Sequence, residues 1–202
     1  GITSYILDKP DQYIQQYAEE WYLIDQHYRR AIKGLNDLDT SAIPEFIDYD
    51  GLKKDVNQVY EKHIDQLNRQ WLSCLNHFNF DYSKVSAPKQ FDFYQAEVAG
   101  YDQKGVVIIS DALRYEVGRE LLKELYKDSK NTAESKYKLA SIPSKTSVGM
   151  AQLLPHQSID FNDGSLSING TSTEGSANRQ TILQTQHEDA KTVTFQEVSS
   201  NE

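Results

Sequence analysis

Apolar residues in the first part of the chain recur at the spacing of one helix face. From Tyr13 to Ile32 they follow one another at steps of four and three, at Tyr13, Tyr17, Trp21, Ile24, Tyr28 and Ala31. Pro10 and Asp11 suit the first turn of such a helix. A second pattern of this kind runs from residue 52 to residue 78. Because these steps place side chains on one face, we expect two amphipathic helices packed as an antiparallel pair.

The pattern changes near residue 94. Gly105–Ile109 is an uninterrupted run of a glycine and four β-branched residues, which is typical of a parallel strand covered on both faces. A helical stripe follows in "YEVGRELLKELYK", "SKYKLASIP" predicts a second strand, and "TSVGMAQLL" predicts another helix. This alternating order predicts an α/β fold, a mostly parallel sheet with flanking helices after an N-terminal helical region.

Three further elements are predicted towards the end of the chain. "IDFNDGSLSING" has the pattern of a β-hairpin with Asp163 and Gly164 at its turn. "STEGSANRQTILQTQ" predicts a helix and "KTVTFQEV" a last strand. We therefore expect a helical region over residues 1–90 and an α/β domain over residues 91–202.

Composition narrows the class of protein. The 202 residues are 38% hydrophobic and carry a formal net charge of −9, which argues against a general nucleic-acid coat protein. No apolar run approaches the roughly 20 residues needed to cross a bilayer, and the first residues lack the pattern of a secretory signal. We expect a cytoplasmic protein without a membrane partner, in contact with nucleic acid only indirectly. The single cysteine, Cys74, is expected to be a small buried residue rather than a catalytic thiol.

Two predicted strand ends carry groups capable of chemistry. Asp111 follows "VVIIS", and Thr146 lies in "PSKTS" after "KLASI". Ligands of open α/β sheets bind outside the carboxyl ends of the strands, so we expect both side chains to face one crevice, within about 5 Å, the reach of a shared cation. A carboxylate there can ligate a divalent cation, and a threonine at a helix start lies near N–H groups that attract phosphate.

Helix capping is the alternative interpretation of both residues. Aspartate is a preferred N-cap, although a capping box would place Glu or Gln three positions later, where Arg114 stands. Thr146 or Ser144 would equally serve as the N-cap of the next helix. Periodicity and spacing alone leave both interpretations open.

"VVIISDALRYEVGREL" and "ASIPSKTSVGMAQLLP" resemble the core of the PglZ family, the phosphatase component of bacterial phage-defence systems of the BREX type. "INGTSTEGSANRQTIL" resembles the segment that follows in that family. The resemblance covers most of the chain and implies an alkaline-phosphatase-like α/β domain. It also implies other BREX proteins as partners, such as a DNA methyltransferase, and a phosphoester substrate of unspecified type.

The resemblance also implies roles for individual residues. "DALR" looks like the Asp-Gly-aromatic-Arg step of nucleotide pyrophosphatases, and "PSKT" like their Pro-Thr-Lys-Thr step. By this likeness Asp111 is a metal ligand and Thr146 the nucleophile, activated at a site for two divalent cations, expected to be zinc. Lys145, Arg114 and Ser147 are weaker candidates for binding phosphate.

The chain departs from the superfamily pattern after Thr146. Such a site needs about five or six Asp and His ligands, most of them beyond the nucleophile, whereas His156 and His187 are the only histidines there. His156 is expected in a loop and "HED" at a polar helix end. We therefore expect a fragment that lacks most metal ligands and has little or no phosphatase activity.

Other classes remain as alternatives. The aromatic-rich helices would form a docking module for other defence proteins if Trp21, Tyr28 or Trp71 were exposed. A receiver-type phosphoacceptor would need an acidic pair at an earlier strand end, and none is visible. A haloacid-dehalogenase-type phosphatase would need a second aspartate two residues after Asp111, where Leu113 stands.

Overall fold

The computed structural model describes residues 6–39, 41, 44, 47–101, 103–130 and 132–200. The chain divides into two compact units. We call Gly1–Ala87 with Ala112–Tyr137 the helical unit, and Pro88–Asp111 with Lys138–Glu202 the mixed unit.

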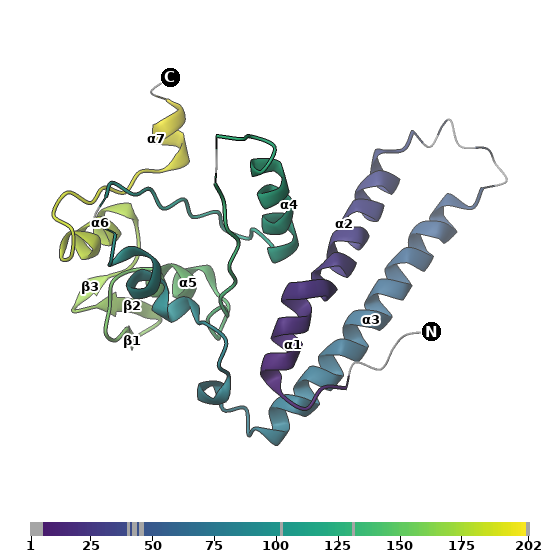
Figure 1. Ribbon diagram of the computed structural model, residues 1–202, viewed down its shortest axis with the longest axis horizontal. Coiled ribbons are helices and arrows are strands. Elements are labelled where there is room, and N and C mark those ends of the chain that lie inside the picture. Colours follow the sequence, from purple (N-terminus) through teal and green to yellow (C-terminus); the bar gives the residue numbers. More distant parts are fainter. Residues whose placement is uncertain are drawn as a thin grey trace. The chain divides into compact units, whose positions relative to one another are not determined.

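The helical unit is built on a long helical hairpin. Its first arm is α1 (Pro10–Gln16), a π-helical turn (Tyr17–Trp21) and α2 (Tyr22–Asp37), and its second arm is α3 (Tyr49–His77). The two arms run side by side (Figure 1). The predicted antiparallel pair is therefore confirmed, and Pro10 takes the first position of α1 as expected. The π-helical turn interrupts what the spacing predicted as one continuous helix.

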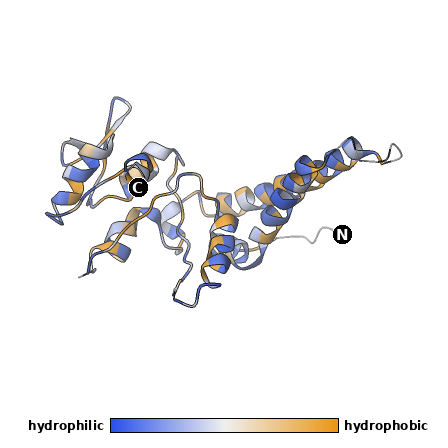
Figure 2. Ribbon diagram, turned by 90° about the horizontal axis from the view of Figure 1, so that it is seen from above, coloured by the Kyte–Doolittle hydropathy of each residue, from blue (hydrophilic) through white to orange (hydrophobic). Residues whose placement is uncertain are grey.

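Aromatic side chains form the core of the helical unit. Tyr13, Trp21 and Cys74 are buried together. The Tyr13 ring packs edge-on against Trp21 and Trp71, with centroids 6.1 and 5.6 Å apart. Hydrophobic and hydrophilic positions alternate along both arms in Figure 2, as amphipathic helices require. Cys74 is thus the buried residue that the sequence predicted, and burial raises the pKa of its thiol.

Helix α4 (Tyr115–Leu125) packs on α2 within the helical unit. The Tyr115 hydroxyl donates to the Ala18 carbonyl at 3.0 Å, and its ring lies edge-on to Tyr22 with centroids 5.5 Å apart. The boundary near residue 90 stays a prediction, while the described contacts group α4 with the helices that precede it.

The mixed unit contains a small antiparallel sheet with a helix on each of two strands. The strands β1 (Asp160–Asn162), β2 (Ser165–Ile168) and β3 (Thr171–Ser172) lie in that order. Helix α5 (Thr146–Gln152) contacts β2, and α6 (Ser176–Gln184) contacts β3. Leu154, Ile168 and Ile182 are buried together as its core.

The hairpin and the helix predicted in this part of the chain are confirmed. Asp163 and Gly164 connect β1 to β2 with φ of 48° and 83°. A two-residue turn with φ positive at both positions matches the right-handed twist of the flanking strands, which is why Asp-Gly is favoured there.

The predicted combination of N-terminal helices with a mixed helix-and-sheet part is confirmed, but a parallel orientation is not observed. Described strands pair antiparallel, and the described parallel contact is a single bridge between Lys89 and Leu139. Gly105–Ile109 forms no strand and joins no ladder, and the strand predicted at residues 135–143 is reduced to that bridge. The physical reason is that the described residues offer these segments no neighbouring strand with which to exchange hydrogen bonds.

The last predicted strand is wrong. The second half of "KTVTFQEV" instead belongs to the helix α7 (Phe195–Ser199). Thr194 and Glu197 form a reciprocal capping box, in which the Thr194 N–H donates to Glu197 Oε2 at 2.6 Å. This cap satisfies free N–H groups at the helix start, and it outweighs the β-propensity of Val193 and Phe195.

No helix in the described part of the chain is both long and apolar enough to cross a membrane.

Candidate active site

Asp111 and Thr146 are in direct contact. The Thr146 hydroxyl donates to Asp111 Oδ2 at 3.2 Å, and both residues belong to the mixed unit. Both are exposed. The expected approach within about 5 Å is therefore present, although 35 residues separate them in sequence.

Thr146 is held by the packing of α5. It is the first residue of that helix, and Ala151, five residues further on, is completely buried. Gln90 Nε2 donates to the Gly149 carbonyl at 3.1 Å, and a Cβ on Gly149 would lie 3.3 Å from that nitrogen. The small residue therefore allows Gln90 to tie α5 to the segment that precedes it by about 60 residues.

Backbone hydrogen bonds fix the segment that leads to Thr146. Gln90 N donates to the Leu139 carbonyl at 2.8 Å, and Leu139 N to the Pro88 carbonyl at 2.7 Å. The buried Ser141 hydroxyl donates to the Pro143 carbonyl at 3.1 Å. The start of α5 is therefore tethered on both sides.

Helix capping does not explain the positions of Asp111 and Thr146. The N-cap of α5 is Lys145, which makes no side-chain cap bond, so neither Thr146 nor Ser144 is the cap. The N-cap of α4 is Arg114, three residues after Asp111. The capping alternatives for Asp111 and Thr146 are thus excluded by the helix boundaries.

The weaker candidates differ in their surroundings. Lys145 and Ser147 are exposed and flank Thr146. Arg114 belongs to the helical unit, where its charge lowers the pKa of the Tyr60 hydroxyl against the larger effects that raise it. The phosphate-binding role of these three residues stays a prediction.

A metal site would need more donors than this pair supplies. Carboxylate and hydroxyl oxygens are hard donors of the kind that divalent cations accept. Within the ranges that the structure describes, however, no three or more His, Cys, Asp or Glu side chains gather to hold a metal ion. The donor chemistry therefore fits a cation, whereas the number of donors does not.

The two late histidines lie as the sequence predicted. His156 Nδ1 is 2.6 Å from the Leu154 carbonyl, in the turn after α5, and its ring packs edge-on against Phe91. His187 lies just after α6, where its N–H donates to the Leu183 carbonyl at 3.0 Å.

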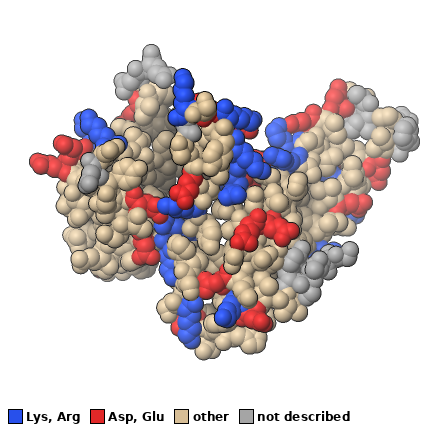
Figure 3. All heavy atoms as spheres, in the orientation of Figure 1, with Lys and Arg blue, Asp and Glu red and all other residues tan. Residues whose placement is uncertain are grey.

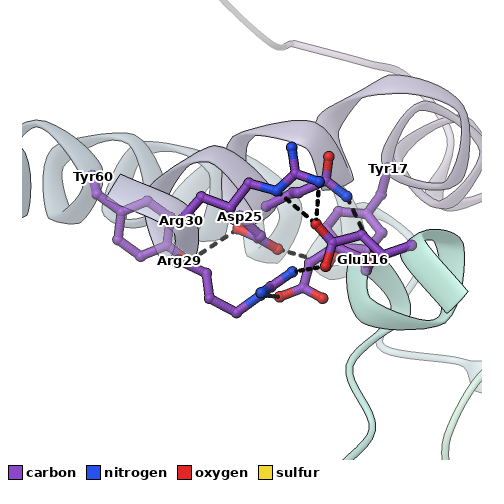
Figure 4. Close-up of polar contacts among 8 residues, drawn as sticks. Tyr17, Asp25, Arg29, Arg30, Tyr60 and Glu116 are labelled. Atoms are coloured by element: carbon purple, nitrogen blue, oxygen red, sulfur yellow. Dashed lines mark hydrogen bonds and ion pairs between the residues drawn. The ribbon is translucent and has the colours of Figure 1, made fainter. Parts of the chain in front are cut away.

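A polar cluster in the helical unit was missed by sequence reasoning. Asp25 accepts hydrogen bonds from Tyr17 at 2.6 Å and from Tyr60 at 2.9 Å (Figure 4). Burial, followed by the bond to Asp25, raises the pKa of Tyr60 to about 12, and the same causes raise the pKa of Tyr17. The helical spacing places Tyr17 on an apolar helix face, and nothing in that spacing indicated a carboxylate shared between two tyrosines.

Next to this cluster, ion pairs join α2 to α4. Arg29 Nε donates to Glu116 Oε1 at 3.0 Å, and Glu116 is completely buried. Glu120 binds both Arg29 and Arg30 at 2.5 Å, and the hydrogen bond from Arg29 is the main cause of its lowered pKa. The partners are about 90 residues apart, so no local spacing rule reveals them.

The surface shows no separation of acidic from basic side chains on the face that Figure 3 draws. Acidic and basic side chains are interspersed over the face drawn in Figure 3. Neither this distribution nor the net charge of −9 supports a nucleic-acid coat protein.

Comparison with known proteins gives consistent matches. Residues 93–201 match the family described as "BREX system PglZ alkaline phosphatase-like domain". The chain is 28% identical over 201 residues to the alkaline phosphatase-like protein PglZ of Bacillus cereus (strain H3081.97), which is 95% of this chain and 23% of that protein. It is 32% identical over 181 residues to the alkaline phosphatase-like protein BrxZ of Escherichia coli O9:H4 (strain HS), which is 83% of this chain and 20% of that protein. No solved structure matches significantly. The chain thus spans about a fifth of the length of these curated relatives.

Proposed function

The chain belongs to the PglZ family, and on that premise we propose that it carries part of the active site of a BREX-associated phosphatase or phosphodiesterase. In this proposal Thr146 is the nucleophile and Asp111 a ligand of a divalent cation, which we expect to be zinc. The observation that supports it is the 3.2 Å hydrogen bond between the Thr146 hydroxyl and the Asp111 carboxylate.

The geometry of the pair suits nucleophilic chemistry. A threonine hydroxyl is a weak nucleophile until a neighbouring group accepts its proton or weakens its O–H bond. Because Thr146 Oγ1 donates to Asp111 Oδ2, its proton points at the carboxylate and its lone pairs face elsewhere. Attack of Oγ1 on phosphorus would form a phosphothreonine and release the alcohol of the ester, and water would then free the phosphate. A divalent cation would supply charge to stabilise the attacking and leaving oxygens.

Flanking residues extend the proposal. Lys145 and Ser147 are exposed on either side of Thr146 and would contact the non-bridging phosphate oxygens. The substrate would be a phosphoester, and the partners would be other BREX proteins, such as a DNA methyltransferase. This proposal includes a cytoplasmic location.

A chimera tests the nucleophile. This chain would replace the matched stretch of the E. coli BrxZ relative, and hydrolysis of a chromogenic phosphodiester would be followed with zinc or manganese. We expect Thr146→Ala to lower kcat by about a thousandfold or more, Thr146→Ser to keep part of it, and Asp111→Asn to weaken the dependence on metal. Ser144→Ala is the matched control and should change little. Equal activity of Thr146→Ala and the parent chimera would refute the assignment.

Docking through the helical hairpin is the alternative function. Trp21 is buried, and Tyr28 and Trp71 are half-buried, each packed against aromatic residues of the same unit. An exposed aromatic stripe would favour docking, so the burial of Trp21 and the half-buried state of Tyr28 and Trp71 give that alternative little support.

A further inference from the structure

One residue of the mixed unit, Gln90, hydrogen-bonds to the chain on both sides of Thr146. Its backbone N–H donates to the Leu139 carbonyl at 2.8 Å. Its side-chain Nε2 donates to the Gly149 carbonyl at 3.1 Å. We call these two bonds the Gln90 clamp. The clamp encloses residues 140–148, the stretch that carries the proposed nucleophile.

Burial holds the end of α5 but not its start. Residues 142–147 are exposed, whereas Ala151 near the end of the helix is completely buried. A helix of seven residues is too short to be stable on its own. The first turn of α5 therefore depends on hydrogen bonds from outside the helix.

The side-chain arm of the clamp binds the residue that closes this first turn. The Gly149 N–H donates to the Lys145 carbonyl at 2.9 Å, which closes the turn around Thr146. The carbonyl of the same Gly149 accepts from Gln90. Hydrogen bonds in series polarise and strengthen one another, so Gln90 supports the turn that orients the Thr146 hydroxyl.

Gly149 leaves room for the side chain of Gln90. Its φ does not lie in the left-handed region, so the backbone conformation does not require a glycine. Glycine is also among the least favourable residues inside a helix. A Cβ at this position, however, would lie 3.3 Å from Gln90 Nε2, and the amide would have to move by a few tenths of an ångström. The close approach of Gln90 is therefore a physical reason for the glycine.

We propose that Gln90 is a positioning residue of the catalytic site, which holds the Thr146 hydroxyl against the Asp111 carboxylate without touching the substrate. This inference rests on the proposed function. An attacking oxygen must be held in one direction, and a misplacement of about 1 Å lowers the rate by about a hundredfold. The bond between Thr146 and Asp111 is already 3.2 Å long, so a small shift of the first turn is enough to break it.

The chimera with the E. coli BrxZ relative tests this role. Gln90→Met keeps the length of the side chain and the backbone bond to Leu139 but removes the donor to Gly149. We expect kcat to fall by about ten- to a hundredfold with KM unchanged, since Gln90 does not bind the substrate. Gln184→Met is the matched control and should change neither constant. Gln184 Nε2 also donates to a backbone carbonyl of the mixed unit, that of Ala190, at 3.0 Å.

Double variants separate positioning from general stabilisation. A residue that acts through Thr146 has nothing to position once the hydroxyl is gone, so Gln90→Met should not lower the residual rate of Thr146→Ala any further. Gly149→Ala should lower kcat in the parent chimera and leave it unchanged beside Gln90→Ala, where the amide that it displaces is missing. A loss by the same factor with and without the Thr146 hydroxyl would overturn the inference.

Amide hydrogen exchange in the chain alone tests the clamp without hydrolysis or metal. Gln90→Met should speed exchange of the Gly149 amide by about tenfold, the effect of losing one hydrogen bond. The Thr173 amide, which donates to the Leu166 carbonyl at 3.0 Å, is the internal control and should exchange as before. Unchanged exchange at Gly149 would show that Gln90 does not hold the first turn.

The outcomes distinguish this inference from the catalytic proposal. If Thr146→Ala inactivates the chimera and Gln90→Met leaves kcat unchanged, the proposed function stands and the role of Gln90 is wrong. If Thr146→Ala stays active, the proposed function fails, and the role of Gln90 in it fails as well.

Discussion

The residue after Asp111 adopts a backbone conformation that its side chain disfavours. Ala112 has φ of 57°, in the left-handed region. A Cβ in that region costs about 1 to 2 kcal/mol. The turn thus directs the chain from Asp111 into α4 at an energetic cost that a glycine would avoid.

Replacing Ala112 by glycine should therefore stabilise the protein. The relief of strain exceeds the added entropy of the unfolded chain, so we expect Ala112→Gly to raise the free energy of unfolding by about 0.5 to 1 kcal/mol. Urea denaturation measures the change. Ala31→Gly, on the exposed face of α2, is the control and should lower the free energy of unfolding by about 1 kcal/mol. The same sign for both variants would contradict a strained Ala112.

The sequence predicted the meeting of Asp111 and Thr146 because both follow apolar runs that end in a polar residue. It derived their contact from a mostly parallel sheet, whereas the described strands form only a small antiparallel sheet. In the structure the contact depends instead on α5, on Gln90 and on the bridge at Leu139. Those tertiary hydrogen bonds join residues about 50 to 60 positions apart, where periodicity carries no information.

At the scale of elements, a buried carboxylate determines how α4 is held. Glu116 has no exposed surface, and Arg29 from α2 is an ion-pair partner of its Oε1. Its Oε2 is buried without a hydrogen-bond partner in the described part of the chain. Removing one partner of a buried ion pair is costly because the remaining charge stays desolvated.

Arg29→Met should consequently lower the free energy of unfolding by about 3 kcal/mol, as measured by urea denaturation. Lys33→Met removes an exposed ion pair with Asp37 on the same helix and should cost less than about 1 kcal/mol. The double variant Arg29→Met with Glu116→Leu should recover much of the loss, because no unpaired charge is then buried. Additive losses in the double variant would show that the two residues do not act as a pair.

Elements that are determined by nearby residues, such as tight turns and amphipathic helices, were predicted well. Strands, which need a neighbouring strand to pair with, were not. The hairpin at Asp163-Gly164 and the long arms of the helical hairpin follow from turn chemistry and helix periodicity. Gly105–Ile109 has every local property of a strand but lacks a neighbour within the described residues. In "KTVTFQEV" a capping box at Thr194 and Glu197 stabilises a helix where the residue pattern had predicted a strand.

A histidine in the helical unit makes stability depend on pH. Burial lowers the pKa of His63, and the nearby charge of Asp25 only partly opposes that effect. The unfolded chain, with an ordinary histidine pKa of about 6.5, binds the proton more readily than the folded one. The contribution of neutral His63 to the free energy of unfolding is therefore fully present above about pH 6.5. It is lost as the pH drops from there towards the folded-state pKa.

Thermal melts followed by circular dichroism between pH 7.5 and pH 5 would measure this loss. His63→Gln should flatten the dependence, whereas His77→Gln, at an exposed position of α3, should leave it unchanged. An identical slope for the parent and His63→Gln would contradict a role for His63.

At the scale of the whole molecule, the described residues form two separate hydrophobic cores. One is aromatic and lies in the helical unit around Tyr13 and Trp21. The other is aliphatic and lies in the mixed unit around Leu154, Ile168 and Ile182. Units with their own cores can unfold as separate cooperative steps.

We accordingly expect two transitions in differential scanning calorimetry. Leu154→Ala should destabilise one of them by about 2 to 4 kcal/mol, and Arg29→Met should shift only the other. If either substitution moved both transitions by the same amount, the chain would unfold as one cooperative unit.

The aromatic core of the helical unit has a spectroscopic consequence. The chain has two tryptophans, Trp21 and Trp71, and both pack around the ring of Tyr13. Tryptophan emission is therefore a reporter confined to the helical unit and silent about the mixed unit. A refolding experiment followed by fluorescence would record the assembly of the hairpin alone, with no added dye or label.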